Sequence, residues 1–254
     1  MIEYMSPESL QDRTDRALGP DLSKLPSSLL LRRYTKLPTL IYMLQRRCVR
    51  MSDPRMWEDA NDRAYLERYR QLEDLKSIFV LCFTTGKAQF HHWKIFAGCP
   101  CGVCVRFKPR VLASSFAGIR GISMGKVQYL SRKQVDVLLG STAAAEKLPF
   151  LKRTQFEDEH EYRIVYGDRD KIDLIEVGLK LDSIDSIVLS PWLNADEFAS
   201  VRSSIRALQG CSGLDVGHST TLSDKTWMHA LRRVERSHSA PAVQSGRNRQ
   251  KGGT

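Results

Sequence analysis

The chain has 254 residues and a formal net charge of +10 at pH 7, with 42% hydrophobic and 27% charged residues. This composition is ordinary for a globular protein and excludes collagen-like, coiled-coil and wholly disordered chains. No segment approaches the roughly 18 consecutive apolar residues of a membrane-spanning helix, and the polar start of the chain has no apolar core of a signal peptide. We therefore expect a cytoplasmic protein with no membrane partner.

The domain organisation follows from where apolar periodicity begins and ends. Residues 1–27 lack periodicity and contain three prolines, which predicts a loosely ordered N-terminal arm. Residues 28–236 are long enough to bury one sizeable core, so we expect a single domain there. Residues 237–254 are rich in Ser, Gly and Arg without spaced apolar residues, which predicts a disordered basic tail.

Positive charge concentrates at the C-terminal end. Between His229 and Thr254 there are six Lys and Arg residues and one acid, which is half of the net charge of the chain. Within the predicted tail, Arg247, Arg249 and Lys251 would attract polyanions without sequence preference. The tail therefore indicates nucleic acid as a partner.

The first predicted elements are a strand at 29–34, which carries Arg33 and Tyr34, and a helix that follows it. Apolar residues at helical spacing predict this helix, with Thr35 as its N-cap; they are Leu37, Leu40, Ile41 and Leu44. A polar, aromatic-bearing loop at 57–62 is of the kind that lines a site, and a second helix is predicted by Tyr65, Leu66, Tyr69 and Leu72.

Residues 77–83 form a continuous apolar run that ends at Thr84. Such a run predicts a central strand covered on both faces. A short helix at 91–96 follows, with Trp93 and Phe96 one turn apart. These aromatics have two interpretations, which are packing in the core and a stacking wall for a base or nicotinamide ring.

Cys99, Cys101 and Cys104 form the one cluster whose spacing suggests a metal site. A structural zinc site needs four ligands, and no second cysteine pair follows, so His91 or His92 would have to supply the fourth. Apolar alternation at 102–107 instead predicts a strand in which Cys104 is an ordinary buried thiol. We expect no metal.

Further strands are predicted at 102–107, 125–129, 161–166, 172–176 and 184–190, and helices at 133–139 and after a capping box formed by Asn194 and Glu197. The later strands follow one another too closely for helical crossovers. We therefore expect an α+β fold, a single domain with a central mixed or antiparallel sheet flanked by helices.

The stretch 149–166 combines apolar alternation with many ionisable groups. If a strand runs from Glu159, period-2 geometry places Glu159, Glu161 and Arg163 on one face. Together with Lys152, this row of charges would hold a sugar hydroxyl, a cation or a leaving group. The alternative interpretation is a solvated strand face on which the charges offset each other weakly.

Several of these segments resemble a bacterial family known as domain of unknown function 2971, some of whose members are associated with abortive infection. The similarity is carried by short motifs spread over residues 30–228: Arg33-Tyr34, Met51-Ser-Asp-Pro with Trp57 and Asp59, Leu81-Cys-Phe-Thr84, Trp93 with Phe96, 102–107, the array from Lys152 and Phe156 to Arg163, and Ser190-Pro-Trp192. The sequence departs from the family pattern at Cys99-Pro-Cys101. Membership would imply a role in phage defence and carries no chemistry by itself.

A looser resemblance is to ADP-ribosyltransferases, which place an Arg or His, a hydroxyl or aromatic set, and a Glu on successive strands. Arg33, Thr84 and Glu161 occur in that order. The resemblance implies that NAD is a substrate and that Arg33, Tyr34, Thr84, Trp93 and Lys152 bind it, with Arg33 on a phosphate and Trp93 on the nicotinamide. The implied catalytic residues are Glu161, Glu159 and Arg163, with Glu161 on the ribose 2′-hydroxyl; the macromolecular target remains open.

Two other functions are compatible with the sequence. One is a non-catalytic module that binds nucleic acid or protein, with the basic tail as its electrostatic contact. The other is a metal-dependent nuclease that would use Glu159, Glu161 and Asp59, although no nuclease motif is present. Turnover of NAD, salt-sensitive binding and Mg²⁺ dependence distinguish the three.

Overall fold

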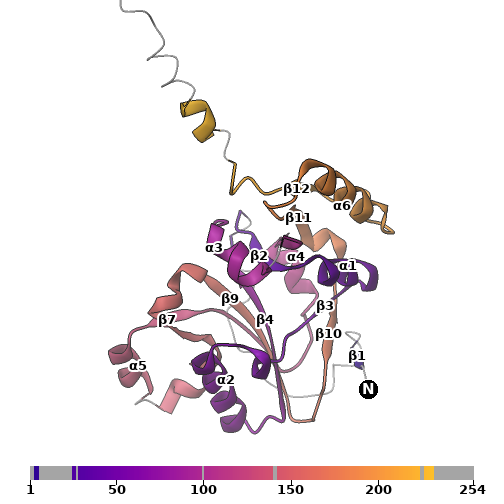
Figure 1. Cartoon of the computed structure of the whole chain (residues 1–254). Helices are drawn as coiled ribbons and strands as arrows, with labels where there is room; N and C mark the ends of the chain where they lie inside the picture. Colours follow the sequence, from indigo (N-terminus) through magenta and orange to yellow (C-terminus); the bar gives the residue numbers. More distant parts are fainter. Residues whose placement is uncertain are drawn as a thin grey trace, which may run out of the picture. The chain divides into compact units, whose positions relative to one another are not determined.

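A seven-stranded sheet organises the fold, which a computed structural model describes for residues 3–5, 25–26, 28–98, 100–139, 142–223 and 226–231 (Figure 1). Across the sheet the strands are β12 (Val216–His218), β11 (Ile184–Leu189), β5 (Gly102–Phe107), β2 (Leu31–Lys36), β4 (Ser77–Thr84), β9 (Glu161–Asp168) and β6 (Ile122–Lys126). β11 and β12 are parallel, and the other neighbours are antiparallel. The predicted α+β fold with a central mixed sheet is confirmed.

The chain divides into two units, Met1–Ser219 and Thr220–Thr254. All labelled strands and helices belong to the first unit, and residues 226–231 of the second are helical. The predicted tail at 237–254 and most of the predicted arm at 1–27 lie outside the described residues. Within the described ranges, no helix is long and apolar enough to cross a membrane.

In the described part of the first unit there are also two smaller sheets and six α-helices. One sheet contains β1 (Glu3–Met5), β10 (Ile175–Gly178) and β3 (Cys48–Arg50), and the other contains β7 (Gln128–Leu130) and β8 (Leu151–Arg153). The helices are α1 (Leu37–Arg46), α2 (Ala60–Leu72), α3 (Phe90–His92), α4 (Pro109–Ser114), α5 (Arg132–Leu139) and α6 (Ala195–Ala207). Short 3-10 helices lie at Pro54–Met56, Thr142–Phe150, Thr154–Glu159 and Leu181–Ser183, and a π-helical turn lies at Trp93–Ala97.

Different helices cover the two faces of the central sheet. Leu40 of α1, Leu112 of α4 and Ile205 of α6 belong to the largest buried core. On the other face, Leu66 of α2 packs in a separate cluster that includes Val80. Figure 1 shows the same separation, with α2 at the lower left and α1, α4 and α6 at the upper right. Strand β4 is thus buried on both faces, as the apolar run at 77–83 predicts.

The start of α1 differs from the prediction. Its N-cap is Lys36, without a side-chain hydrogen bond, whereas Thr35 lies within β2 opposite Val103. Pro38 occupies the first turn, where a missing N–H breaks no helical hydrogen bond. The capping box of Asn194 and Glu197 at the start of α6 is confirmed.

The strand predicted at 125–129 is two strands in two sheets. β6 ends at Lys126, and the Val127 N–H donates to the Glu161 carbonyl at 2.9 Å. β7 then begins at Gln128 and pairs with β8. The break lets the Tyr129 hydroxyl accept a hydrogen bond from the Glu161 N–H at 2.8 Å. The strand predicted at 172–176 lies slightly later, at Ile175–Gly178.

Candidate functional site

Strands β2, β4 and β9, the start of α2 and residues from 152 to 161 line a cavity of about 540 Å³. This volume lies within the usual range of small-molecule sites. The three strands are neighbours, and their register pairs Arg32 with Thr84 and Thr84 with Glu161. Because paired residues point to the same face of a sheet, three adjacent strands present these side chains together.

Arg163 on β9 lies beneath the cavity and has no exposed surface. Its Nε and Nη2 donate to the Glu161 carboxylate at 2.9 and 2.8 Å, and its Nη1 and Nη2 donate to Asp62 at 2.8 and 2.6 Å. Nη1 also donates to the Pro149 carbonyl at 2.9 Å. All five N–H groups therefore have acceptors, and the two bidentate pairs fix the guanidinium. This geometry makes Arg163 a residue that orients carboxylates.

Asp62 reaches this cluster from the first turn of α2, whose N-cap is Asp59. A carboxylate there is favoured by the helix dipole. Asp62 was not among the site residues predicted from the sequence, and it lies 101 residues from Arg163 in the chain. A signal was present, because Asp62 shares a helical face with Leu66 and Tyr69. An acid on an apolar face needs a buried partner.

Lys152 on β8 places a second cation among the carboxylates. Its Nζ lies 2.5 Å from Glu159, 3.4 Å from Glu161 and 3.7 Å from Asp62. The Lys152 side chain is 11% exposed, so solvent screens these interactions weakly. With Arg163, two cations face three carboxylates, and the cluster retains one negative charge.

Glu159 and Glu161 have different affinities for a proton. Glu159 is the last residue of the 3-10 helix Thr154–Glu159. The prediction that it lies on the same strand as Glu161 is therefore wrong. Burial raises the pKa of Glu159, and this effect exceeds the opposing one of Lys152. Burial also favours a raised pKa for Glu161, but the Arg163 guanidinium and Lys152 outweigh it and lower the pKa to about 2. Carboxyl groups whose pKa values are driven apart in this way are typical of acid–base sites.

Two arginines of β2 bring further positive charge to the same cavity. Arg32 donates to the Leu30 carbonyl at 3.3 Å, and Arg33 donates to the Cys82 carbonyl at 3.2 Å. Among the residues that the structure describes, neither has an acidic ion-pair partner. Burial lowers the pKa of Arg33, and Arg32 Nε is buried without a hydrogen-bond acceptor. Both guanidinium groups would gain from an anionic ligand.

The aromatic surface of the cavity differs from the expected one. Trp93 is 1% exposed and packs edge-on against Tyr34, with ring centroids 5.1 Å apart. It belongs to the core, which was one of its two interpretations. Trp57, Phe96 and Phe156 line the cavity, so these rings, and not Trp93, are placed to contact a flat ligand.

The cavity brings together most of the predicted site residues, namely Arg33, Tyr34, Thr84, Lys152, Glu159 and Glu161. Arg163 lies beneath them and Trp93 in the adjoining core. The register adds Arg32, because Arg32 and not Arg33 is the partner of Thr84. Arg32 and Tyr34 share a face of β2, but alternation within the strand does not show that this face lies opposite Thr84.

Cys101 and Cys104 are not among the residues that line this cavity. Cys104 is a buried thiol on β5, next to Tyr34 and Trp93, as the alternation predicts, and Cys101 is exposed. Cys99 lies outside the described residues. Within the part of the chain that the structure describes, no group of three or more His, Cys, Asp or Glu side chains has an arrangement that could hold a metal ion.

No protein-family model matches the chain, and no curated protein is significantly similar to it. Membership in the domain of unknown function 2971 family therefore remains a prediction from the motifs quoted above. The same holds for the looser similarity to ADP-ribosyltransferases.

Proposed function

We propose that the chain transfers ADP-ribose from NAD to a macromolecular target. The observation that carries the proposal is the division of one cavity into two parts. Arg32 and Arg33 offer guanidinium groups without acidic partners among the described residues, while Glu159 and Glu161 form an acidic cluster with Lys152. NAD has a matching division, with a diphosphate at its centre and a ribosyl–nicotinamide bond towards one end.

The cationic part would hold the diphosphate. Arginine forks bind phosphate oxygens in a bidentate manner, and the poor solvation of Arg33 favours the approach of an anion. Trp57, Phe96 and Phe156 offer flat apolar surfaces for the nicotinamide or adenine ring. These contacts bind and orient the substrate.

Glu161 is suited to the bond-breaking step. As nicotinamide leaves C1′ with the bonding electron pair, positive charge develops on the ribose ring. An ionised carboxylate held at that position stabilises this charge without having to reorient, and Arg163 keeps Glu161 both ionised and fixed. The Glu161 carboxylate would also accept a hydrogen bond from the ribose 2′-hydroxyl.

Glu159 is suited to the transfer step. The acceptor forms a bond to C1′ and must lose a proton. Of the two glutamates, Glu159 has the raised pKa, which makes its carboxylate the stronger base. Lys152 contacts both glutamates and would stabilise the acidic cluster before the proton arrives.

The cavity favours this reaction over a metal-dependent nuclease. In a nuclease, a divalent cation would lie among the carboxylates. Here the Lys152 ammonium lies at the centre of Asp62, Glu159 and Glu161 and supplies the positive charge. Asp59 instead caps α2 and pairs with Arg153 at 3.6 Å.

Incubation of the purified protein with NAD and a bacterial lysate tests the proposal. Release of nicotinamide with labelling of a macromolecule from the lysate is expected for the wild type and not for Glu161→Gln. If the chain acts as a defence effector, its expression should also arrest a bacterial host, and Glu161→Gln should relieve that arrest. Growth arrest that persists unchanged in Glu161→Gln, without any loss of NAD, would contradict the proposal.

A further inference from the structure

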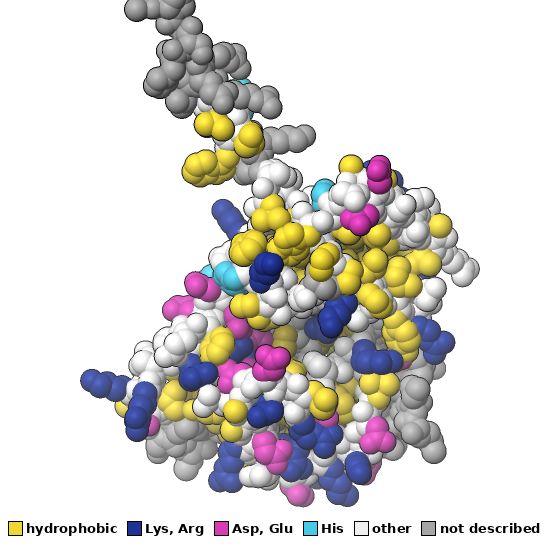
Figure 2. Space-filling view, in the orientation of Figure 1, with side chains coloured by type: hydrophobic (Ala, Val, Ile, Leu, Met, Phe, Trp, Pro, Cys, Tyr) yellow, Lys and Arg dark blue, Asp and Glu magenta, His cyan; other side chains and the backbone are white. Residues whose placement is uncertain are grey.

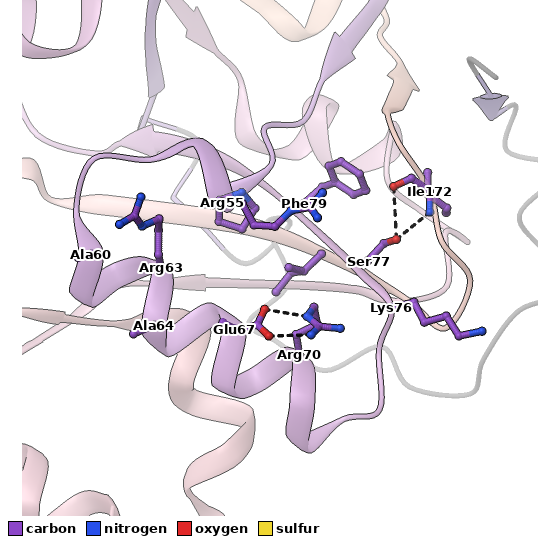
Figure 3. A pocket seen from close by; sticks show the side chains of 12 residues that line it. Arg55, Ala60, Arg63, Ala64, Glu67, Arg70, Lys76, Ser77, Phe79 and Ile172 are labelled. Carbon is purple, nitrogen blue, oxygen red and sulfur yellow. Dashed lines mark hydrogen bonds and ion pairs between the residues drawn. The ribbon is translucent and has the colours of Figure 1, made fainter.

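A second cavity, of about 640 Å³, lies against a different face of α2 (Figure 3). It is bounded by the turn at Pro54–Met56, by α2 and by the start of β4. Ile78, Phe79 and Ile172 give it an apolar lining. Ala60 and Ala64 are two of the α2 residues that line it, and their small side chains leave space beside the helix.

Four cations line this cavity, and they are Arg55, Arg63, Arg70 and Lys76; Glu67 is the one acid among the lining residues. Arg70 donates to Glu67 at 2.8 and 2.6 Å, and Arg55 pairs with an aspartate outside the cavity. Arg63 and Lys76 are exposed and have no acidic ion-pair partner among the described residues. The cavity therefore carries uncompensated positive charge.

These cations are spread along the cavity. Arg63 and Arg70 project from α2 two turns apart, which is about 10 Å along the helix axis. Lys76 projects from the loop between α2 and β4 and points away from the arginines (Figure 3). A single phosphate group needs donors that converge on one point. Donors spaced along a groove instead suit a ligand with repeated phosphates. Figure 2 shows many Lys and Arg side chains on the lower part of the molecule.

We infer that this cavity binds nucleic acid through its phosphate backbone, with Arg63 and Lys76 as the principal contacts. DNA and RNA share this backbone chemistry, so both are probes. The inference is independent of the ADP-ribosyltransferase proposal, because these cations do not line the cavity that holds Glu161. It is also independent of the basic tail at 237–254.

The test measures the fluorescence anisotropy of labelled oligo-dT and oligo-rU with the full chain over a series of salt concentrations. The variant is the double substitution Arg63→Gln with Lys76→Gln. The matched control is Arg110→Gln with Lys180→Gln, which removes the same charge from two exposed residues elsewhere. All proteins keep the tail, so its contribution is constant, and thermal unfolding checks that each variant folds.

We expect the Arg63/Lys76 variant to bind at least about tenfold more weakly and the control to bind like the wild type. The slope of log affinity against log salt should become shallower by about 1.4, because each lost contact to a single strand contributes about 0.7. Equal weakening by both double variants would overturn the inference, since net charge alone would then explain binding. So would displacement of the oligonucleotide by inorganic phosphate at constant ionic strength, which would indicate a site for one phosphate group.

Discussion

The Arg163 guanidinium donates two parallel hydrogen bonds to the Glu161 carboxylate, from Nε to Oε1 at 2.9 Å and from Nη2 to Oε2 at 2.8 Å. The two residues alternate along β9 and so lie on one face of the sheet. The other edge of the guanidinium holds Asp62 in the same manner. Glu161 is therefore an ionised group whose orientation is fixed from beneath the cavity.

Replacement of Arg163 by methionine should destabilise the protein by about 3–5 kcal/mol, because the buried carboxylates of Glu161 and Asp62 lose their bidentate partner and keep only the longer contacts to Lys152. Urea unfolding at neutral pH measures this loss. Arg153→Met is the matched control, since Arg153 is half exposed and pairs with Asp59, and it should cost less than about 1 kcal/mol. Similar losses in both variants would mean that the buried ion pairs of Arg163 stabilise the protein no more than the exposed pair of Arg153.

Lys152 and Glu159 should be energetically coupled. Lys152→Met leaves three carboxylates facing one cation, so we expect a clear loss of stability at neutral pH. Glu159→Gln in the same chain removes one of those negative charges and should restore part of the lost stability. The four proteins of this double-mutant cycle should give a coupling free energy of about 1–3 kcal/mol. Additive effects would show that the 2.5 Å contact between these side chains does not stabilise the fold.

Local patterns were sufficient to predict much of this site. Period-2 alternation placed Glu161 and Arg163 together on one strand face, and the apolar run at 77–83 identified the central strand beside them. The prediction for Glu159 failed at one residue. His160 has a φ of 44°, so the extended backbone begins only after it, at Glu161. Glu159 still meets Lys152, since the 3-10 helix returns the chain to β8.

Long-range pairings could not be predicted in this way. Asp62 joins Arg163 only because α2 packs over β4 and β9. The choice between Arg32 and Arg33 depended on the register of β2 against β4, which side-chain alternation within one strand does not determine. Trp93 illustrates the same limit, because its amino-acid type suits both a core and a stacking wall.

The pH dependence of stability should reveal the ionised state of Glu161. Folding lowers its pKa from 4.5 to about 2, so its stabilising effect is present above pH 4.5 and is lost as the pH falls through that window. The effect is on the order of 3 kcal/mol. The free energy by which Glu161→Gln destabilises the protein should therefore shrink towards low pH. Glu157→Gln, at an exposed residue of the same segment, is the control, and a Glu161→Gln effect that is independent of pH would contradict the assignment.

Removal of the tail should leave the fold intact. Ser237 to Thr254 has no spaced apolar residues, and ordering such a segment would cost roughly 1–2 kcal/mol per residue in backbone entropy. A chain that ends at Ser237 should keep its thermal unfolding midpoint but bind polyanions more weakly, with a shallower salt dependence. A large drop in the midpoint would show that the tail packs on the rest of the protein. An unchanged salt dependence would show that Arg247, Arg249 and Lys251 do not contribute to binding.

The most direct test measures NAD affinity and the rate of nicotinamide release together, for the wild type, Glu161→Gln and a double Arg32→Gln, Arg33→Gln variant. We predict that Glu161→Gln lowers the release rate at least about a hundredfold with little change in NAD affinity. The double arginine variant should instead weaken NAD binding, because its substitutions remove the proposed diphosphate contacts. Release of nicotinamide at the wild-type rate by Glu161→Gln, or failure of the wild type to bind NAD at all, would contradict the account.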